Sequence, residues 1–234
     1  MKAGIIAAGL GERLSRAGIS GPKPLVRVNG VPLIEHTLRA IGAAGVREVV
    51  CIINEASSAV ATYCQEHIRD LPVRFIHRTT PSSMESLFAL APYLAEDMFL
   101  LLTVDAIVAP AALRDFVRAA AARAADGVLA VNDFIDDEKP LHVACDDDGR
   151  INAIGDAAAD SPLITAGFYV FHPRIFAEID AARAAGFTAL RQFLAHLVAR
   201  GYRLFGERVP KCVDVDRPED IATAESFIRS GYRA

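Results

Sequence analysis

The sequence has no concentrated positive charge. No run of basic residues exceeds two, and the formal net charge of the 234-residue chain is −4. Binding along a nucleic-acid backbone requires a dense cationic surface, so nucleic acid is excluded as the expected partner. A small anionic substrate requires only a few well-placed cations and remains compatible with this composition.

Long apolar segments are also missing. No apolar run approaches the roughly 20 residues that a membrane-spanning helix needs. The apolar stretch near the N-terminus is too short for the hydrophobic core of a signal peptide, and glycines and charges follow it at once. We therefore expect a cytoplasmic protein without a membrane span.

Cysteine is scarce, and its spacing is irregular. The chain has four cysteines, and no two of them form a C-x-x-C motif. In a cytosolic protein this pattern favours reduced structural thiols over a zinc site or disulfide bonds.

Hydrophobic residues are plentiful, at 52% of the chain, which suits one large α/β domain with a well-buried core. No segment has the composition of a linker, so we predict a single domain over residues 1–234. Short apolar runs alternate with segments of helical periodicity, which predicts an α/β fold with a mostly parallel sheet and helices on both faces. In the first half, the predicted strands cover residues 3–8, 48–53, 73–77, 98–103 and 127–131, and the predicted helices cover 32–44, 57–67, 83–91 and 111–125.

The pattern changes after residue 132. Two short apolar runs flank an Asp-Gly pair at positions 148 and 149, which predicts an antiparallel hairpin. The predicted strands here cover residues 141–145, 151–154, 165–171, 202–209 and 213–215, and the predicted helices cover 174–185, 189–200 and 218–228.

A glycine-rich segment follows the first predicted strand, and we interpret residues 9–23 as a long loop. Gly9 and Gly11 would let backbone N–H groups approach a phosphate without an intervening Cβ. Arg13 and Lys23 add positive charge, and the prolines on both sides of Lys23 stiffen its backbone. A simple tight turn after the strand is the alternative interpretation of the two glycines.

Two common phosphate-binding motifs do not fit this loop. A dinucleotide fingerprint requires a third glycine, but Leu14 occupies that position. The G-x-x-x-x-G-K-[ST] pattern of a P-loop is absent.

Three segments near the N-terminus resemble the signature of the nucleotidyltransferase superfamily. They read Ala-Ala-Gly-Leu-Gly-Glu-Arg at 7–13, Gly-Pro-Lys-Pro-Leu at 21–25 and Asn-Gly-Val-Pro-Leu-Ile-Glu at 29–35. The superfamily includes NDP-sugar pyrophosphorylases and phospho-alcohol cytidylyltransferases. The resemblance implies one three-layer α/β/α domain of the Rossmann-like GT-A type with a small antiparallel acceptor-side sheet. Its nucleotide-binding half would cover about 1–132 and its acceptor-binding half about 133–234.

The same resemblance implies roles for individual residues. The loop backbone would hold a triphosphate, and Arg13 and Lys23 would contact phosphates as catalytic residues. The nucleotide-binding residues would be Ala7, Ala8, Gly9, Gly11, Glu12, Ser86 and Asp105. Many sugar enzymes have Thr at the position of Glu12, so the loop does not by itself imply a sugar acceptor.

Three aspartates are candidate metal ligands. Asp105 follows an apolar strand, at the sheet edge where α/β proteins bind ligands. Asp214 and Asp216 alternate along a later strand, so both carboxylates could line one face. Asp216 could equally cap the helix that begins near Pro218. Mg²⁺ usually takes one or two carboxylates together with waters and substrate phosphates, and the resemblance implies Mg²⁺ at Asp105 with Asp214 or Asp216.

The acceptor side is less specific. Ser86 and Leu87 resemble the cytidylyltransferases more than the sugar enzymes, which favours CTP. Gly167 lies in an Ala-Gly-Phe-Tyr-Val-Phe segment that in the superfamily lies against the acceptor, although a packing glycine is the alternative. Lys139 could bind an anionic group of the acceptor or could be an ordinary exposed lysine.

The expected function is transfer of a nucleoside monophosphate from an NTP, with CTP or UTP favoured. The acceptor would be a phosphorylated small molecule, either a sugar-1-phosphate or a phospho-alcohol, and pyrophosphate would leave. A GT-A-type glycosyltransferase and a non-catalytic nucleotide-binding regulatory protein are the alternatives. The sequence is compatible with a homodimer but does not identify the oligomeric state.

Overall fold

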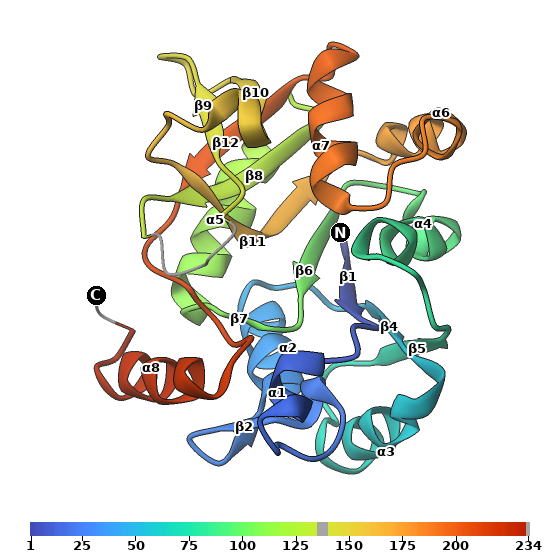
Figure 1. The fold of residues 1–234 in the computed structure, drawn as a ribbon, viewed down its shortest axis with the longest axis vertical. Helices are drawn as coiled ribbons and strands as arrows, with labels where there is room; N and C mark the ends of the chain where they lie inside the picture. The colour runs from blue at the N-terminus through green and yellow to red at the C-terminus, as the bar shows by residue number, and fades with distance from the viewer. Residues whose placement is uncertain (135–139, 233–234) are drawn as a thin grey trace.

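The computed structural model describes residues 1–134 and 140–232. Its centre is a seven-stranded sheet in the order β12-β8-β11-β6-β1-β4-β5 (Figure 1). All neighbouring strands are parallel except β11, which runs antiparallel to both β6 and β8. The predicted mostly parallel α/β sheet is therefore confirmed. The strands are β1 (Lys2–Ala7), β4 (Val49–Ile53), β5 (Val73–His77), β6 (Phe99–Thr103), β8 (Gly127–Asn132), β11 (Ile164–Phe171) and β12 (Leu204–Arg208).

Helices cover both faces of the sheet, because successive strand residues point to opposite sides. Ile5 packs into the apolar cluster under α2, α3 and α5, whereas Ile6 packs into the cluster under α4, α6 and α7. Leu100 and Leu101 on β6 divide in the same way. The helices are α1 (Glu12–Arg16), α2 (Leu33–Ala43), α3 (Ser58–His67), α4 (Ser83–Leu94), α5 (Pro110–Ala122), α6 (Ile179–Ala184), α7 (Leu190–Ala199) and α8 (Pro218–Arg229). No helix in the described ranges is long and apolar enough to cross a membrane.

Three two-stranded antiparallel sheets complete the fold. The predicted hairpin is confirmed as β9 (Val143–Cys145) and β10 (Ile151–Ile154). The other two sheets pair β2 (Arg27–Val28) with β3 (Val31–Pro32), and β7 (Ala106–Ile107) with β13 (Val213–Asp214). Of these four strands only β13 was predicted, because a strand of two residues is too short to show alternation.

Three predicted segments need correction. The loop predicted over 9–23 contains α1, where Leu14 is only 2% exposed, and ends at a 3-10 helix over Lys23–Leu25. Helix α4 runs past Pro92, since burial of the residues around it outweighs one lost backbone hydrogen bond. The helix predicted over 174–185 begins as a 3-10 helix, Pro173–Glu178, before α6. A 3-10 turn places residues three apart on one side, as the buried pair Ile175 and Glu178 requires.

A third apolar cluster joins the two ends of the chain. It packs α1 and the β2–β3 hairpin against β7, β13 and α8. This packing places the loop after β1 beside the segment that follows β13, as Figure 1 shows for α1 and α8. Its buried members are Leu14, Val26, Val28, Leu33, Ile107, Val213, Val215, Ala224 and Phe227.

Candidate active site

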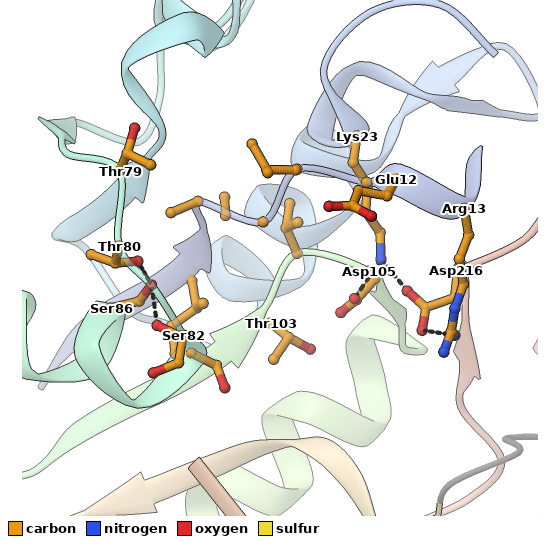
Figure 2. Close-up of a pocket in the computed structure, with 18 of the residues that line it drawn as sticks. Glu12, Arg13, Lys23, Thr79, Thr80, Ser82, Ser86, Thr103, Asp105 and Asp216 are labelled. Carbon is orange, nitrogen blue, oxygen red and sulfur yellow. Dashed lines mark hydrogen bonds and ion pairs between the residues drawn. The ribbon is translucent and has the colours of Figure 1, made fainter. Parts of the chain in front are cut away.

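A cavity of about 600 Å³ lies at the carboxyl ends of β1 and β6, and we call it the nucleotide pocket. Figure 2 shows its two ends, with charged side chains at one and hydroxyl side chains at the other. In open parallel sheets this edge is the usual ligand site. Ten residues predicted from the sequence line it, namely Ala7, Ala8, Gly9, Gly11, Glu12, Arg13, Lys23, Ser86, Asp105 and Asp216.

The two loop glycines have different structural settings. Gly11 has a φ of +61°, and a Cβ there would lie 2.9 Å from Cβ of Lys23. Glycine is therefore needed at position 11 so that the chain can turn and the stem of Lys23 can pack against it. A Cβ at Gly9 would meet no protein atom within 4 Å. Since Gly9 lines the pocket, the space beside it is open to a ligand.

Lys23 links the carboxylates at the charged end of the pocket. Its side chain is 9% exposed, and its Nζ donates a hydrogen bond of 2.7 Å to Oδ2 of Asp105. Nζ also forms an ion pair with Asp216, which in turn lies 3.4 Å from Nη1 of Arg13 (Figure 2). The two predicted catalytic cations and two of the three aspartates predicted as metal ligands thus form one connected group.

The ion pairs oppose the effect of burial on both partners. Burial alone would lower the pKa of Lys23, but the carboxylates of Asp105 and Asp216 outweigh it and raise that pKa above its ordinary value. Burial alone would raise the pKa of Asp105, but Lys23 and a hydrogen bond from Thr103 hold it below its ordinary range. Both groups are therefore charged at neutral pH.

Backbone pairing brings the distant acidic residues together. Asp214 in β13 lies opposite Ala106 in β7, and the backbone N–H of Val215 donates to the carbonyl of Asp105 at 3.1 Å. This short antiparallel pair continues from the end of β6. The predicted meeting of Asp105 with the C-terminal acidic segment therefore follows from main-chain hydrogen bonds.

Asp216 does not cap α8, so that alternative is wrong. The N-cap residue is Arg217, and the side chain of Asp220 accepts hydrogen bonds from the backbone N–H groups of Asp216 and Arg217, at 2.9 and 2.7 Å. Because Asp220 satisfies the helix start, the carboxylate of Asp216 is available to pair with Lys23 and Arg13.

A second cavity of about 230 Å³, which we call the acceptor-side cavity, adjoins the nucleotide pocket. The two share Ser83, Thr103 and Asp105. Of these two cavities, only the acceptor-side cavity is lined by Asp214 and Gly167. Asp105 is therefore the carboxylate that both cavities share.

Gly167 lies where β11 departs from regular pairing with β8, between Thr165 and Tyr169. Its φ is +79°, and a Cβ there would lie 3.1 Å from Oγ1 of Thr103 and 3.7 Å from Oδ1 of Asp214. A side chain at position 167 would therefore be strained and would press on the carboxylate end of the cavity.

The Tyr169 side chain lines the same cavity and is only 4% exposed. Burial raises the pKa of Tyr169 to about 12, with smaller effects from Thr165, Asp214, Asp105 and Arg191. The hydroxyl group therefore stays protonated near neutral pH and can donate a hydrogen bond to an anionic ligand.

The carboxylates also meet the basic requirement of a magnesium site. Asp105 and Asp214 line one cavity and supply only hard oxygen donors, which Mg²⁺ prefers. Among the described residues, no three His, Cys, Asp or Glu side chains gather as a metal cage. Two carboxylates completed by substrate phosphates and water would be compatible with both observations.

The hydroxyl end of the nucleotide pocket was only partly predicted. Ser82 caps α4 by accepting a hydrogen bond from the backbone N–H of Glu85 at 3.2 Å. The hydroxyl groups of Thr80 and Ser86 lie 2.6 Å apart (Figure 2). Sequence reasoning missed Thr79, Thr80, Thr165, Tyr169 and Arg191 as lining residues, because isolated hydroxyl or basic residues carry no spacing pattern.

Two further predicted residues need comment. Glu12 lines the nucleotide pocket, but its carboxylate lies 2.5 Å from Nη2 of Arg16, one helical turn away. Lys139 lies outside the described residues.

The chain matches a known protein family over most of its length. The profile described as "MobA-like NTP transferase domain" matches residues 3–201. The chain is 24% identical to a UTP–glucose-1-phosphate uridylyltransferase of Haloferax volcanii over 98% of this chain and 97% of that protein. It is 36% identical to a bifunctional IPC transferase and DIPP synthase of Rubrobacter xylanophilus, over 50% of this chain and 26% of that protein.

Solved structures show the same fold. The inositol-1-phosphate CTP transferase from T. maritima superposes with a TM-score of 0.82 at 20% identity, covering 100% of this chain and 98% of that one. The profile match over residues 3–201 places the chain, as the sequence resemblance predicted, among the nucleotidyltransferases. The chain belongs to the MobA-like NTP transferase family.

Proposed function

We propose that this protein is a Mg²⁺-dependent nucleotidylyltransferase. It transfers a nucleoside monophosphate from CTP or UTP to a phosphorylated small molecule, and pyrophosphate leaves. The observation that carries the proposal is the position of Lys23, whose Nζ lies 2.7 Å from Asp105 beneath the glycine loop. The pair of Lys23 and Asp105 lies where the nucleotide pocket, which is large enough for a nucleotide, meets the smaller acceptor-side cavity.

The chemistry requires alignment and charge neutralisation more than proton transfer. An oxygen of the acceptor phosphate, already an anion, attacks the α-phosphorus as the bond to the β-phosphate breaks. No general base is needed, so the residues act by holding phosphates in place and offsetting their charge. Arg13 and Lys23 are the cations of the pocket that are fixed by ion pairs to the same carboxylate, Asp216.

Asp105 and Asp214 are the residues that would hold Mg²⁺, because they line the cavity on the acceptor side of the pocket. Bound there, the ion would supply positive charge to the phosphates. Asp216 then serves Lys23 and Arg13 rather than the metal, since it pairs with both cations.

The preference for a pyrimidine nucleotide rests on similarity. The Haloferax relative is named as a uridylyltransferase and the T. maritima protein as a CTP transferase. The hydroxyl groups of Thr80 and Ser86 offer donors and acceptors to a base at the end of the pocket away from Lys23.

A pyrophosphate-release screen tests the proposal. Four NTPs are crossed with sugar-1-phosphates, polyol phosphates and phosphocholine, with and without Mg²⁺. We expect release that requires both substrates and Mg²⁺, and that is greatest with CTP or UTP. Release with no acceptor dependence would contradict it. In a parallel reaction supplied with a nucleotide sugar in place of the NTP, cleavage that does not require added pyrophosphate would also contradict it and would favour a glycosyltransferase.

A further inference from the structure

The acceptor-side cavity has acidic walls and little positive charge. Asp105 and Asp214 both line it, and among its described lining residues Arg191 is the only lysine, arginine or histidine. An acceptor phosphate entering this cavity brings further negative charge. A cation is needed on the protein side to offset it, in addition to any metal ion at the carboxylates.

Arg191 is the second residue of α7, and the start of this helix is held firmly. The side-chain oxygen of Gln192 accepts hydrogen bonds from the backbone N–H groups of Thr188 and Ala189, at 2.8 and 3.0 Å. Leu190 and Phe193 are buried on the sheet. Arg191 therefore extends from a fixed point of the backbone, which favours reproducible placement of a functional side chain.

The neighbours of Arg191 suit a phosphate. Tyr169 and Thr165 line the same cavity and add hydroxyl groups, and Gly167 leaves the approach to the carboxylates open. A guanidinium group can bind two phosphate oxygens at once, which fixes orientation as well as charge. Lysine at this position would supply charge without that orientation.

We propose that Arg191 binds the attacking phosphate of the acceptor and positions it toward Asp105 and Asp214. This inference rests on the proposed function, and it assigns the recognition of the acceptor's phosphoryl group to a residue of α7. The rest of the acceptor then contacts the apolar part of the cavity, around Leu141, Ile164 and Leu190.

Residue-level footprinting tests this assignment. The protein is saturated with Mg²⁺ and a CTP or UTP analogue that carries carbon in place of the α–β bridging oxygen. Modification of arginines by phenylglyoxal is then followed by peptide mass spectrometry, with inorganic phosphate, glucose-1-phosphate or phosphocholine as probes. We expect at least one probe to protect Arg191 but not Arg200, an exposed arginine at the end of α7 that does not line the cavity.

Matched variants give a second readout. Binding of the protecting probe is measured in the analogue-saturated protein for Arg191→Gln, Arg191→Lys and the control Arg200→Gln. We expect Arg191→Gln to weaken probe binding by about tenfold or more, Arg191→Lys to weaken it less, and Arg200→Gln to leave it unchanged. All three variants should bind the nucleotide analogue as the wild type does.

Two results would overturn the inference while leaving the proposed function intact. One is unchanged probe affinity in Arg191→Gln with normal analogue binding. The other is loss of probe binding in Lys139→Gln alone, which would assign the phosphate to Lys139. A wild-type protein that bound no nucleotide analogue would instead refute the proposed function, and with it this inference.

Discussion

The ammonium group of Lys23 lies 2.7 Å from Oδ2 of Asp105, although the two residues are 82 positions apart in the chain. Lys23 lies between two prolines at the start of a 3-10 helix, and Asp105 lies two residues beyond the end of β6. The fold thus fixes a cation against a carboxylate at the boundary between the two cavities. In the proposed function Asp105 pairs with Lys23 and also binds the metal ion. Substitution of Lys23 or of Asp105 should therefore affect turnover.

Replacing Lys23 tests the role of this cation. Lys23→Met keeps the apolar stem beside Gly11 but removes the charge, so we expect turnover to fall by about 100-fold or more in a pyrophosphate-release assay. Lys2→Met is the matched control, because Lys2 pairs with Glu96 and does not line the nucleotide pocket. Near-normal turnover in Lys23→Met would refute the role of Lys23.

The same variant has a pH-dependent effect on stability. The pKa of Asp105 is lowered, so its stabilising contribution is present above about pH 5 and is lost as pH falls below its ordinary value of about 3.9. The pKa of Lys23 is raised, so its contribution is present at neutral pH and is lost only as pH rises past its ordinary value of about 10.4.

We therefore expect Lys23→Met to lower the free energy of unfolding by about 1–3 kcal/mol at pH 7, because Asp105 loses its charged partner. The difference from the wild type should shrink toward pH 3. Denaturant unfolding in the presence of EDTA measures this. A difference that stays constant from pH 7 to pH 3 would show that the ion pair does not stabilise the fold.

Gly9 of the nucleotide pocket and Gly167 of the acceptor-side cavity should respond differently to alanine. Gly9→Ala meets no protein atom, so its free energy of unfolding should stay within about 0.5 kcal/mol of the wild type while its KM for NTP rises. Gly42→Ala, in α2 away from the pocket, is the control and should leave KM unchanged. An unaltered KM in Gly9→Ala would mean that no ligand group occupies the space beside residue 9.

Gly167→Ala should instead lose stability. Its positive φ and the Cβ contact of 3.1 Å with Thr103 predict a loss of about 1–3 kcal/mol. Thermal or denaturant unfolding measures it. Wild-type stability in this variant would argue against the strained backbone at position 167.

The two C-terminal aspartates should differ in their effect on metal binding. Asp214 lines the cavity with Asp105, whereas Asp216 pairs with Lys23 and Arg13. We expect Asp214→Asn to raise the Mg²⁺ concentration needed for half-maximal rate by about tenfold. Asp216→Asn should raise KM for NTP more than it changes the Mg²⁺ requirement. Calorimetric titration with Mn²⁺ gives a readout independent of activity, and equal metal affinity in Asp214→Asn and the wild type would contradict this assignment.

Much of the fold followed from the sequence because its strands are strongly apolar and its helices periodic. β5 and β10 have the predicted bounds. The 9–23 segment was harder, since its polar composition concealed that burial of Leu14 would fix α1 against α8. Leu14, the residue that excluded a dinucleotide fingerprint, thus packs the N-terminal segment against the C-terminal helix.

The candidate site was predicted unevenly for a physical reason. Lys23 and Asp105 stand at recognisable places, between prolines and after an apolar strand, so their positions near the pocket could be anticipated. Spacing alone does not decide which aspartate caps α8. In the structure Asp220 accepts the hydrogen bonds of the backbone N–H groups at the start of this helix, and Asp216 does not cap it. The position of Arg191 depends on the packing of α7 against β10 and α4, which are long-range contacts without a local signal.

The central claim is that the site moves the α-phosphoryl group of an NTP onto a phosphorylated acceptor. The most direct measurement is the fate of label in parallel reactions with α-³²P-labelled and γ-³²P-labelled NTP, Mg²⁺ and the best acceptor from the screen. We predict that α-label appears in a nucleotide-linked acceptor and that γ-label appears only in pyrophosphate. Transfer of γ-label to the acceptor, or release of free NMP without any labelled acceptor, would contradict the claim.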